Sequence, residues 1–222
     1  MKLLFIRGFN TNLSNEFDGY SSIKNVYPHM KYFDYSPDED LSDVYKRLCK
    51  KIKSNKYTHL IGHSMGGGML MRYMHDHKIA NDVKIILLMP MIYKTHINKI
   101  ITAITAIPII NKIRLPKPLL LPNKNLYDQG NLTNDTFYWL STSQITSMYN
   151  TIMLEPEQFV STLNSNSNCV LFYASKEAFN EIPESILKQI VNLERIDGLH
   201  ECFNSVGTSG AFFETLAKYI EF

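Results

Sequence analysis

The segment Gly62-His63-Ser64-Met65-Gly66 constrains the fold of this 222-residue chain more than any other feature. Residues 57–61 before it are typical of a short strand, and residues 69–74 after it are typical of an apolar helix. A chain that passes from a strand directly into a helix has to turn sharply. Glycines two residues before and two residues after the serine leave room for such a turn, because any side chain there would collide with the neighbouring strand or helix. The pattern therefore predicts a tight turn with Ser64 at its apex, exposed as a candidate nucleophile.

The remaining pattern alternates between strands and helices. We expect strands at residues 1–6, 30–35, 57–61, 85–89, 169–173 and 191–196, and helices at 36–52, 69–74, 183–190 and 209–220. Ser36 as cap, Pro37 at the first helical position and Glu39 three residues after the cap predict the start of the helix at 36. This alternation predicts an α/β fold: a doubly wound, mostly parallel sheet of about six strands.

The alternation stops for about 70 residues after Tyr93. We therefore expect residues 1–93 and 166–222 to form the core, and residues 94–165 to be a helical lid inserted on top of the sheet. No internal repeat is evident in the sequence.

Composition excludes several other classes of protein. Hydrophobic residues make up 45% and charged residues 20% of the chain, as in folded globular proteins. A net charge of +2 is far from the basic balance of a nucleic-acid-binding protein. The three cysteines are an odd number without a CxxC pair, which predicts neither a disulfide framework nor a metal site and favours a reducing, cytoplasmic location. Residues 1–6 are too short an apolar run for a secretory signal, and residues 100–110 are about half the ~20 residues that span a bilayer.

A serine hydroxyl is a weak nucleophile unless a base removes its proton, so a histidine and an acid are expected later in the chain. His200 follows the last short strand and precedes the terminal helix, where a loop at the carboxyl edge of the sheet can bring it to Ser64. His63 lies inside the turn itself, and the remaining histidines lie before the serine, within a strand, at a helix end or in the insertion. His200 is therefore the predicted base.

The acid has to accept a hydrogen bond from the second imidazole nitrogen of that histidine. Glu177 follows the expected strand at 169–173 by four residues and is our first choice, with Glu181 as the alternative. Asp197 is only three residues from His200, too close in the chain to turn back onto it easily.

Acyl transfer also requires donors for the negative charge that develops on the substrate oxygen, usually two backbone N–H groups. Met65 N–H, at the start of the helix after the serine, is one candidate. The loop after the first strand reads Arg7-Gly8-Phe9-Asn10 and should provide the second, for which Phe9 N–H is our choice.

These residues together resemble the α/β-hydrolase superfamily. The resemblance covers most of residues 1–93 and 168–222, and it is carried by Phe5 to Asn10, Gly62 to Gly67, and Gly198-Leu199-His200. It implies an esterase, lipase, thioesterase or related acyl-transfer enzyme that needs no cofactor or metal. The chain departs from the family in three respects: Arg7 replaces the usual histidine before Gly8, Glu177 replaces the commoner aspartate, and two leading strands of larger members are missing. Neither the arginine nor the glutamate removes the activity, because the backbone donor stays and glutamate can serve as the acid.

In such proteins, an insertion at this position resembles a lid that shapes the substrate pocket. Its isoleucines between 97 and 107 follow helical spacing, and residues 115–122 form a stiff apolar loop, which would suit an apolar acyl group. Residues 83–127 contain no Asp or Glu but seven Lys or Arg, so the lid could make peripheral contact with an anionic lipid surface. The simpler interpretation is that its apolar face packs on the pocket and its lysines face water.

The sequence therefore predicts a serine hydrolase that cleaves small-molecule carboxylic esters with apolar acyl chains. A thioesterase or acyltransferase of the same fold is one alternative, and a non-catalytic ligand receptor built on that fold is the other.

Overall fold

The computed structural model describes residues 1–8, 20–36, 39–91, 114–116, 139–177, 182–198, 202–203 and 209–220. Six parallel strands form one sheet in the order β2-β1-β3-β4-β7-β8. Their bounds are β1 Leu3–Ile6, β2 Lys31–Phe33, β3 His59–His63, β4 Lys84–Leu88, β7 Cys169–Ala174 and β8 Leu193–Ile196. The predicted doubly wound parallel sheet is confirmed, with strand bounds that differ by at most two residues from the expected ones.

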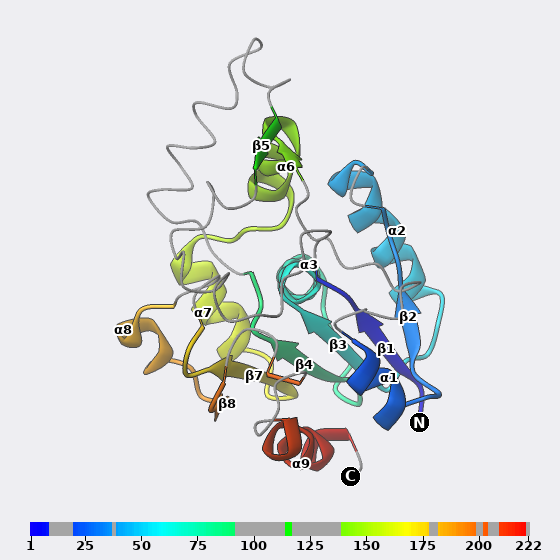
Figure 1. The fold of residues 1–222 in the computed structure, drawn as a ribbon, viewed down its shortest axis with the longest axis vertical. Helices are drawn as coiled ribbons and strands as arrows, with labels where there is room; N and C mark the ends of the chain where they lie inside the picture. The colour runs from blue at the N-terminus through cyan, green and yellow to red at the C-terminus, as the bar shows by residue number, and fades with distance from the viewer. Residues whose placement is uncertain are drawn as a thin grey trace.

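Helices cover both faces of the sheet (Figure 1). On one face lie α2 (Leu41–Lys53), α3 (Met65–Asp76), α7 (Pro156–Asn164) and α8 (Glu184–Leu187), and on the other lie α1 (Ser21–Val26) and α9 (Ser209–Ile220). Each set of helices packs its apolar side chains against the sheet, which gives two separate hydrophobic cores. Strands β1 and β7 are apolar along their whole length, and β4 is apolar after Lys84, because both faces of the sheet are covered.

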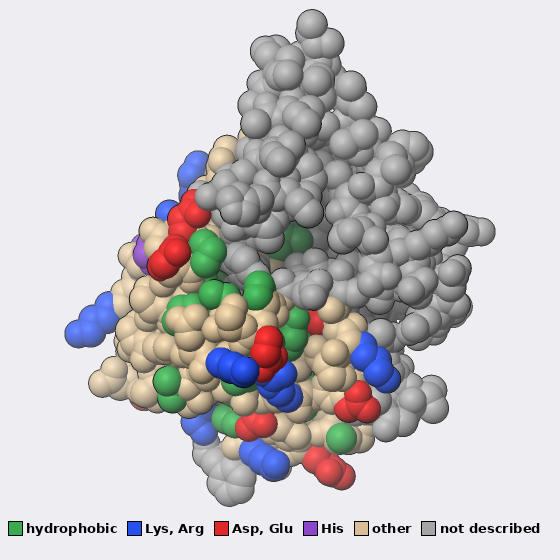
Figure 2. All heavy atoms as spheres, turned by 90° about the vertical axis from the view of Figure 1, so that its left-hand side faces the viewer, with side chains coloured by type: hydrophobic (Ala, Val, Ile, Leu, Met, Phe, Trp, Pro, Cys, Tyr) green, Lys and Arg blue, Asp and Glu red, His purple; other side chains and the backbone are tan. Residues whose placement is uncertain are grey.

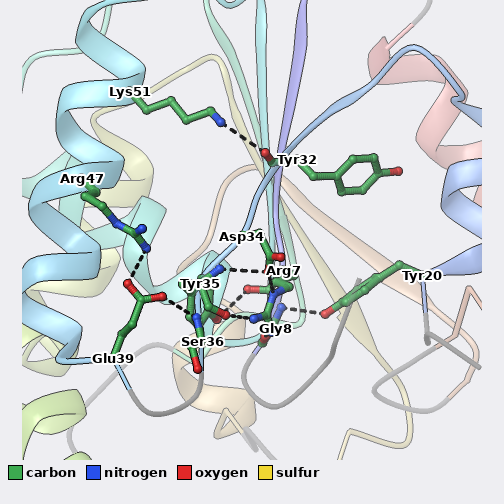
Figure 3. Close-up of polar contacts among 10 residues, drawn as sticks. All are labelled: Arg7, Gly8, Tyr20, Tyr32, Asp34, Tyr35, Ser36, Glu39, Arg47 and Lys51. Atoms are coloured by element: carbon green, nitrogen blue, oxygen red, sulfur yellow. Dashed lines mark hydrogen bonds and ion pairs between the residues drawn. The ribbon is translucent and has the colours of Figure 1, made fainter. Parts of the chain in front are cut away.

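The helix predicted to begin at Ser36 begins instead at Leu41. Asp40 is its cap: the Asp40 carboxylate accepts hydrogen bonds from the backbone N–H groups of Ser42 (2.8 Å) and Asp43 (3.3 Å). A hydrogen bond with the Ser42 side chain lowers the pKa of Asp40 most, and these backbone bonds lower it further. The Glu39 carboxylate does accept the Ser36 N–H (2.5 Å), as the expected capping box requires, but this contact precedes the helix; Glu39 also forms an ion pair with Arg47 (2.8 Å) (Figure 3).

The strand order creates a switch point between β1 and β3. From β1 the chain moves to β2 on one side, and the strands from β3 onward build up on the other side. Ligands of doubly wound proteins bind outside the carboxyl ends of the strands at such a point, where the loops diverge to opposite faces and leave a crevice. Here the residues at these ends are Gly8, two residues after β1, and Ser64, directly after β3.

Part of the predicted insertion lies within the described residues. Two short strands, β5 (Arg114–Pro116) and β6 (Trp139–Ser141), pair antiparallel, and α6 (Thr142–Thr151) follows. The next helix, α7, buries Phe159 and Leu163 in the same core as α3. The helix expected at 97–107 and most of the basic, apolar stretch lie outside the described residues.

Basic and acidic side chains are interspersed on the face that carries α7, α8 and the edge strand β8 (Figure 2). Arg195 pairs with Glu184 at 2.7 Å and Lys176 approaches Asp197 at 4.0 Å there. In the part of the chain that the structure describes, no helix is both long and apolar enough to cross a membrane.

Candidate active site

Ser64 has a backbone conformation that residues other than glycine rarely adopt, with φ 51° and ψ −117°. Such a conformation costs of order 1–3 kcal/mol and persists only where its surroundings hold it. Here the Ser64 N–H donates to the Leu88 carbonyl at the end of β4 (3.0 Å). The Ser64 carbonyl accepts hydrogen bonds from the N–H groups of Gly68 (3.0 Å) and Met91 (2.8 Å). These bonds fix the tight turn, and the Ser64 side chain lies half-buried at the carboxyl edge of the sheet.

Two glycines allow this turn for the steric reason that the sequence suggested. A Cβ on Gly62 would lie 2.6 Å from the Gly66 carbonyl oxygen, across the turn. A Cβ on Gly66 would lie 2.2 Å from the carbonyl oxygen of Ile6 in β1. Since both contacts are with backbone, which cannot move aside as a flexible side chain can, alanine at either position would force the turn open.

Met65 is the first residue of α3, which begins at the switch point directly after Ser64. The first N–H groups of a helix have no acceptor within the helix, and together they carry a partial positive charge. The start of α3 can therefore stabilise negative charge that develops beside Ser64.

Gly8 brings the end of β1 into contact with the same turn. A Cβ on Gly8 would lie 3.1 Å from the Ser64 Cβ and 3.2 Å from Nδ1 of His63. The Gly8 N–H donates to the Tyr20 hydroxyl at 2.6 Å. Because that N–H is already bonded, the next N–H along the chain, that of Phe9, is the better candidate as an oxyanion donor; Phe9 itself lies outside the described residues.

Arg7, which stands where the family usually has histidine, is a buried cation with only 2% of its side chain exposed. Its guanidinium donates to the Asp34 carboxylate through Nε (2.5 Å), to the Tyr35 carbonyl and, through Nη1, to the Gly8 carbonyl (3.3 Å) (Figure 3). It also lies 4.3 Å from the centre of the Tyr35 ring. The charge of Arg7 is thus compensated, and its side chain reaches over the strand end that leads to Gly8.

The Tyr35 hydroxyl completes this arrangement by donating to the Arg7 carbonyl at 3.0 Å. Burial raises the pKa of Tyr35 well above its usual value, although the Arg7 charge acts in the opposite direction. Tyr35 therefore stays a neutral phenol and remains a hydrogen-bond donor at all ordinary pH values.

Tyr20 and His63 form a buried polar pair beside Ser64 that the sequence analysis missed. The Tyr20 hydroxyl and Nδ1 of His63 lie 2.7 Å apart, and the two side chains are 1% and 2% exposed. Tyr20 lies in a stretch for which the sequence analysis predicted neither strand nor helix, and His63 was set aside because it lies within the turn. An aromatic residue beside the apolar Ile23 was the available signal that this stretch begins a packed helix, α1.

Glu177 follows β7 and is a buried carboxylate, with 8% of the residue exposed. Its loop is joined to the loop after β8: the Lys176 N–H donates to the Gly198 carbonyl (2.9 Å), and the Ser175 N–H donates to the Ile196 carbonyl (2.8 Å). The Ser175 hydroxyl also donates to Asp197 (2.7 Å). The segment that carries Glu177 and the segment that leads to His200 therefore lie side by side.

His200 and the alternative acid Glu181 lie outside the described residues, but residues on both sides of His200 are described. Gly198, two residues before it, is held by Lys176 as stated above. Phe203, three residues after it, is fully buried, and its ring packs edge-on against His63 with centroids 5.0 Å apart. Both ends of the short segment that contains His200 are thus attached near the predicted site.

No group of three or more His, Cys, Asp or Glu side chains within the described ranges is arranged to hold a metal ion. The described residues place the Ser64 hydroxyl next to the free N–H end of α3, an arrangement that suits a serine nucleophile.

The fold and the turn at Ser64 define an α/β-hydrolase. Residues 29–141, just over half of the chain, match the family model described as serine aminopeptidase, S33. The chain belongs to this family. A search of curated protein sequences finds no significant match.

Solved structures agree with this fold assignment. A monoacylglycerol lipase from Paleococcus ferrophilus is similar with a TM-score of 0.64 at 13% identity, over 98% of this chain and 92% of that one. An esterase from Exiguobacterium antarcticum gives 0.60 at 16% identity, over 99% and 92%. A soluble variant of the monoglyceride lipase from Saccharomyces cerevisiae, solved with a substrate analogue, gives 0.60 at 13% identity, over 99% and 86%. At these identities the likeness shows the fold.

Proposed function

We propose that the protein is a serine hydrolase that cleaves carboxylic esters, with Ser64 as nucleophile, His200 as base and Glu177 as the acid that orients it. The observation that carries the proposal is the strained backbone of Ser64 at the β1/β3 switch point, in contact with Gly8. A purely structural turn has no need for a serine held at a positive φ, since glycine adopts it without strain.

Chain connectivity supports His200 as the base. Two residues span at most about 7 Å, so His200 stays close to Gly198 and hence to the Glu177 loop. Three residues link His200 to Phe203, whose ring contacts the residue directly before Ser64. Both attachments support the proposal that His200 acts between Glu177 and the serine turn.

The burial of Glu177 supports its role as the acid. A carboxylate with 8% exposure is costly unless partners compensate its charge. We propose that the His200 imidazole is such a partner, donating from Nδ1 to the carboxylate and leaving Nε2 to face Ser64.

In the proposed reaction, His200 takes the Ser64 hydroxyl proton while Oγ attacks the ester carbonyl carbon. The resulting oxyanion accepts hydrogen bonds from the N–H groups of Met65 and Phe9. When the intermediate collapses, the ester C–O bond breaks, the alcohol leaves with the proton from His200, and an acyl group remains on Ser64. Water then attacks this acyl group and gives a proton to His200. When the second intermediate collapses, the bond between the acyl carbon and Ser64 Oγ breaks, His200 returns the proton to Oγ, and the carboxylic acid is released.

The substrate class is proposed from two sources. The similar solved structures are named as monoacylglycerol lipases and an esterase, and the insertion at 94–165 is rich in apolar residues. We therefore propose an ester with an apolar acyl chain, and a lid formed by residues 94–165 that selects chain length.

Steady-state hydrolysis of p-nitrophenyl acetate, butyrate, octanoate and palmitate tests this function. Ser64→Ala and His200→Ala should each lower kcat at least about 10³-fold, because the members of such a triad act as a unit. Aminoacyl p-nitroanilides, run in parallel, test the peptidase chemistry that the family description names. A wild-type enzyme that hydrolyses the anilides but none of the esters would contradict the proposal.

The receptor alternative makes a different prediction for the same assay. A folded wild-type protein that hydrolyses neither series and is unaffected by Ser64→Ala would point to a protein that binds without turnover.

A further inference from the structure

Tyr20 contacts Gly8, His63 and Phe203, which lie next to three parts of the proposed active site. Its hydroxyl accepts the Gly8 N–H at 2.6 Å, next to the proposed oxyanion donor. The same hydroxyl lies 2.7 Å from Nδ1 of His63, the residue directly before Ser64. Its ring stacks on Phe203, three residues beyond His200, with centroids 5.6 Å apart and planes inclined by 22°. Tyr20 is 1% exposed, so none of these contacts is weakened by competition with bulk water.

The bond to Gly8 matters because it restrains a whole peptide group. The Arg7–Gly8 peptide is planar, and it is held at both ends, by the Tyr35 hydroxyl at its carbonyl and by the Tyr20 hydroxyl at its N–H. The next peptide carries the Gly8 carbonyl, held by Arg7 at 3.3 Å, and the Phe9 N–H. In a trans peptide the N–H points away from the carbonyl. The bond to the Gly8 carbonyl therefore restrains the peptide group that carries the proposed oxyanion donor.

The bond to His63 connects this segment with the serine turn. The His63 side chain is almost fully buried between the rings of Tyr20 (5.5 Å between centroids) and Phe203 (5.0 Å), both of which it meets edge-on. A shift of the Tyr20 hydroxyl would move Gly8 relative to His63, and thus the second oxyanion donor relative to Ser64.

We propose that Tyr20 is a positioning residue of the active site. Its hydroxyl bonds both Gly8, next to the proposed oxyanion donor, and His63, next to Ser64, and so fixes the position of that donor relative to Ser64. Tyr20 does not touch the substrate in this account. The inference rests on the proposed serine hydrolase function, and its test separates the two.

The first variant is Tyr20→Phe, which keeps the ring contacts and removes only the hydroxyl. Loss of one oxyanion donor costs about 10²- to 10³-fold in kcat, so a misdirected donor should cost roughly 10- to 100-fold. KM for p-nitrophenyl butyrate should stay within about threefold, because the ground-state ester carries little charge on its oxygen. A trifluoromethyl ketone, which places an oxyanion in the same site when Ser64 adds to it, should bind more weakly by the same factor as kcat/KM falls. A general loss of folded protein would lower kcat but would not weaken the binding of the inhibitor.

His63 provides the second pair of variants. His63→Asn can keep an acceptor near the position of Nδ1, and we expect it to retain kcat within about threefold. His63→Phe keeps an aromatic ring against Phe203 and removes the hydrogen bond, so its loss should match that of Tyr20→Phe. Because both act through one hydrogen bond, the double variant Tyr20→Phe/His63→Phe should lose no more than the worse single variant, whereas independent effects would multiply. If Tyr20→Phe fails to fold, the comparison of His63→Asn with His63→Phe still tests the role of this hydrogen bond.

Tyr45→Phe is the matched control. Its hydroxyl donates to Asp76 at 2.9 Å, at the far end of α3, and a helix of 12 residues is about 18 Å long. It should leave kcat, KM and inhibitor binding unchanged.

Wild-type labelling at Ser64 by a fluorophosphonate separates the two proposals. If wild type is labelled and Tyr20→Phe keeps its kcat within twofold, the role of Tyr20 is wrong and the hydrolase stands. Equal losses in kcat and inhibitor binding for His63→Asn and His63→Phe would also overturn it. If folded wild type is not labelled, the proposed function fails and the role of Tyr20 fails with it.

Discussion

The backbone of Gly8 lies directly against Ser64, so that a Cβ at residue 8 would be 3.1 Å from the Ser64 Cβ. The two residues are 56 positions apart in the chain and meet because β1 and β3 are neighbours, paired with Ile6 opposite Gly62. The contact places the proposed nucleophile next to the segment that leads to the proposed oxyanion donor.

Gly8→Ala should therefore impair catalysis more than folding. The new methyl group would also lie 2.9 Å from the Tyr20 hydroxyl, which has to move and so weakens the bond that holds Gly8. We expect kcat/KM for p-nitrophenyl butyrate to fall about 10- to 100-fold, since misplacement by about 1 Å can cost 10²-fold. Gly210→Ala in α9 is the control: nothing lies within 4 Å of its added Cβ, so it should keep full activity. Equal activities of the two variants would show that the contact of Gly8 with Ser64 has no catalytic importance.

Glu177→Gln should reduce kcat by at least about 10²-fold, because an amide cannot stabilise the imidazolium that forms on His200. Glu181→Gln should have little effect. Both variants change one oxygen to nitrogen at nearly constant volume, so each serves as the control of the other. The reverse order of effects would make Glu181 the acid.

Removing Asp34 from its ion pair with Arg7 should destabilise the protein. Arg7 is 2% exposed whereas Asp34 is 57% exposed, so removing the carboxylate leaves a buried charge without its counter-ion. We expect Asp34→Ala to lower the free energy of unfolding by about 1–3 kcal/mol in urea denaturation.

The double variant Arg7→Met/Asp34→Ala removes the buried charge as well. It should be more stable than Asp34→Ala alone. If the double variant loses as much stability as Asp34→Ala and Arg7→Met lose together, this account is wrong.

His59 should make the protein less stable in mild acid. Burial, and then the nearby charge of Lys84, lower the pKa of His59 below its usual value of about 6.5. As the pH falls through about 6.5, the unfolded chain takes up this proton first, so the free energy of unfolding decreases until the folded pKa is reached. His59→Asn should show a shallower decrease between pH 7 and pH 5, measured by urea denaturation at each pH. Parallel curves for the two proteins would mean that His59 makes no such contribution.

The sequence predicted those features that depend on local spacing. The turn at Ser64 follows from glycines two residues on either side, and the strands follow from apolar runs that both faces of the sheet bury. The start of α2 was wrong because two capping signals lie close together. Ser36 and Asp40 are both suitable caps, and only the folded chain shows that the Asp40 carboxylate meets the first helical N–H groups.

The Tyr20–His63 pair could not be predicted in the same way. Its two residues are 43 positions apart, and they meet only because α1 packs below β1 and β3. The sequence could not decide between Glu177 and Glu181 either, because spacing alone places both after β7. Burial and the link from Lys176 to Gly198 support the proposal of Glu177, and Glu181 lies outside the described residues.

The central claim is that Ser64 is an activated nucleophile, and covalent labelling tests it most directly. Purified wild type and Ser64→Ala are treated with a fluorophosphonate, and the site is located by mass spectrometry of the digested protein. The account predicts one phosphonyl group per wild-type chain, on the peptide that contains Ser64, and none on folded Ser64→Ala. Equal labelling of both proteins, or no labelling of folded wild type, would contradict it.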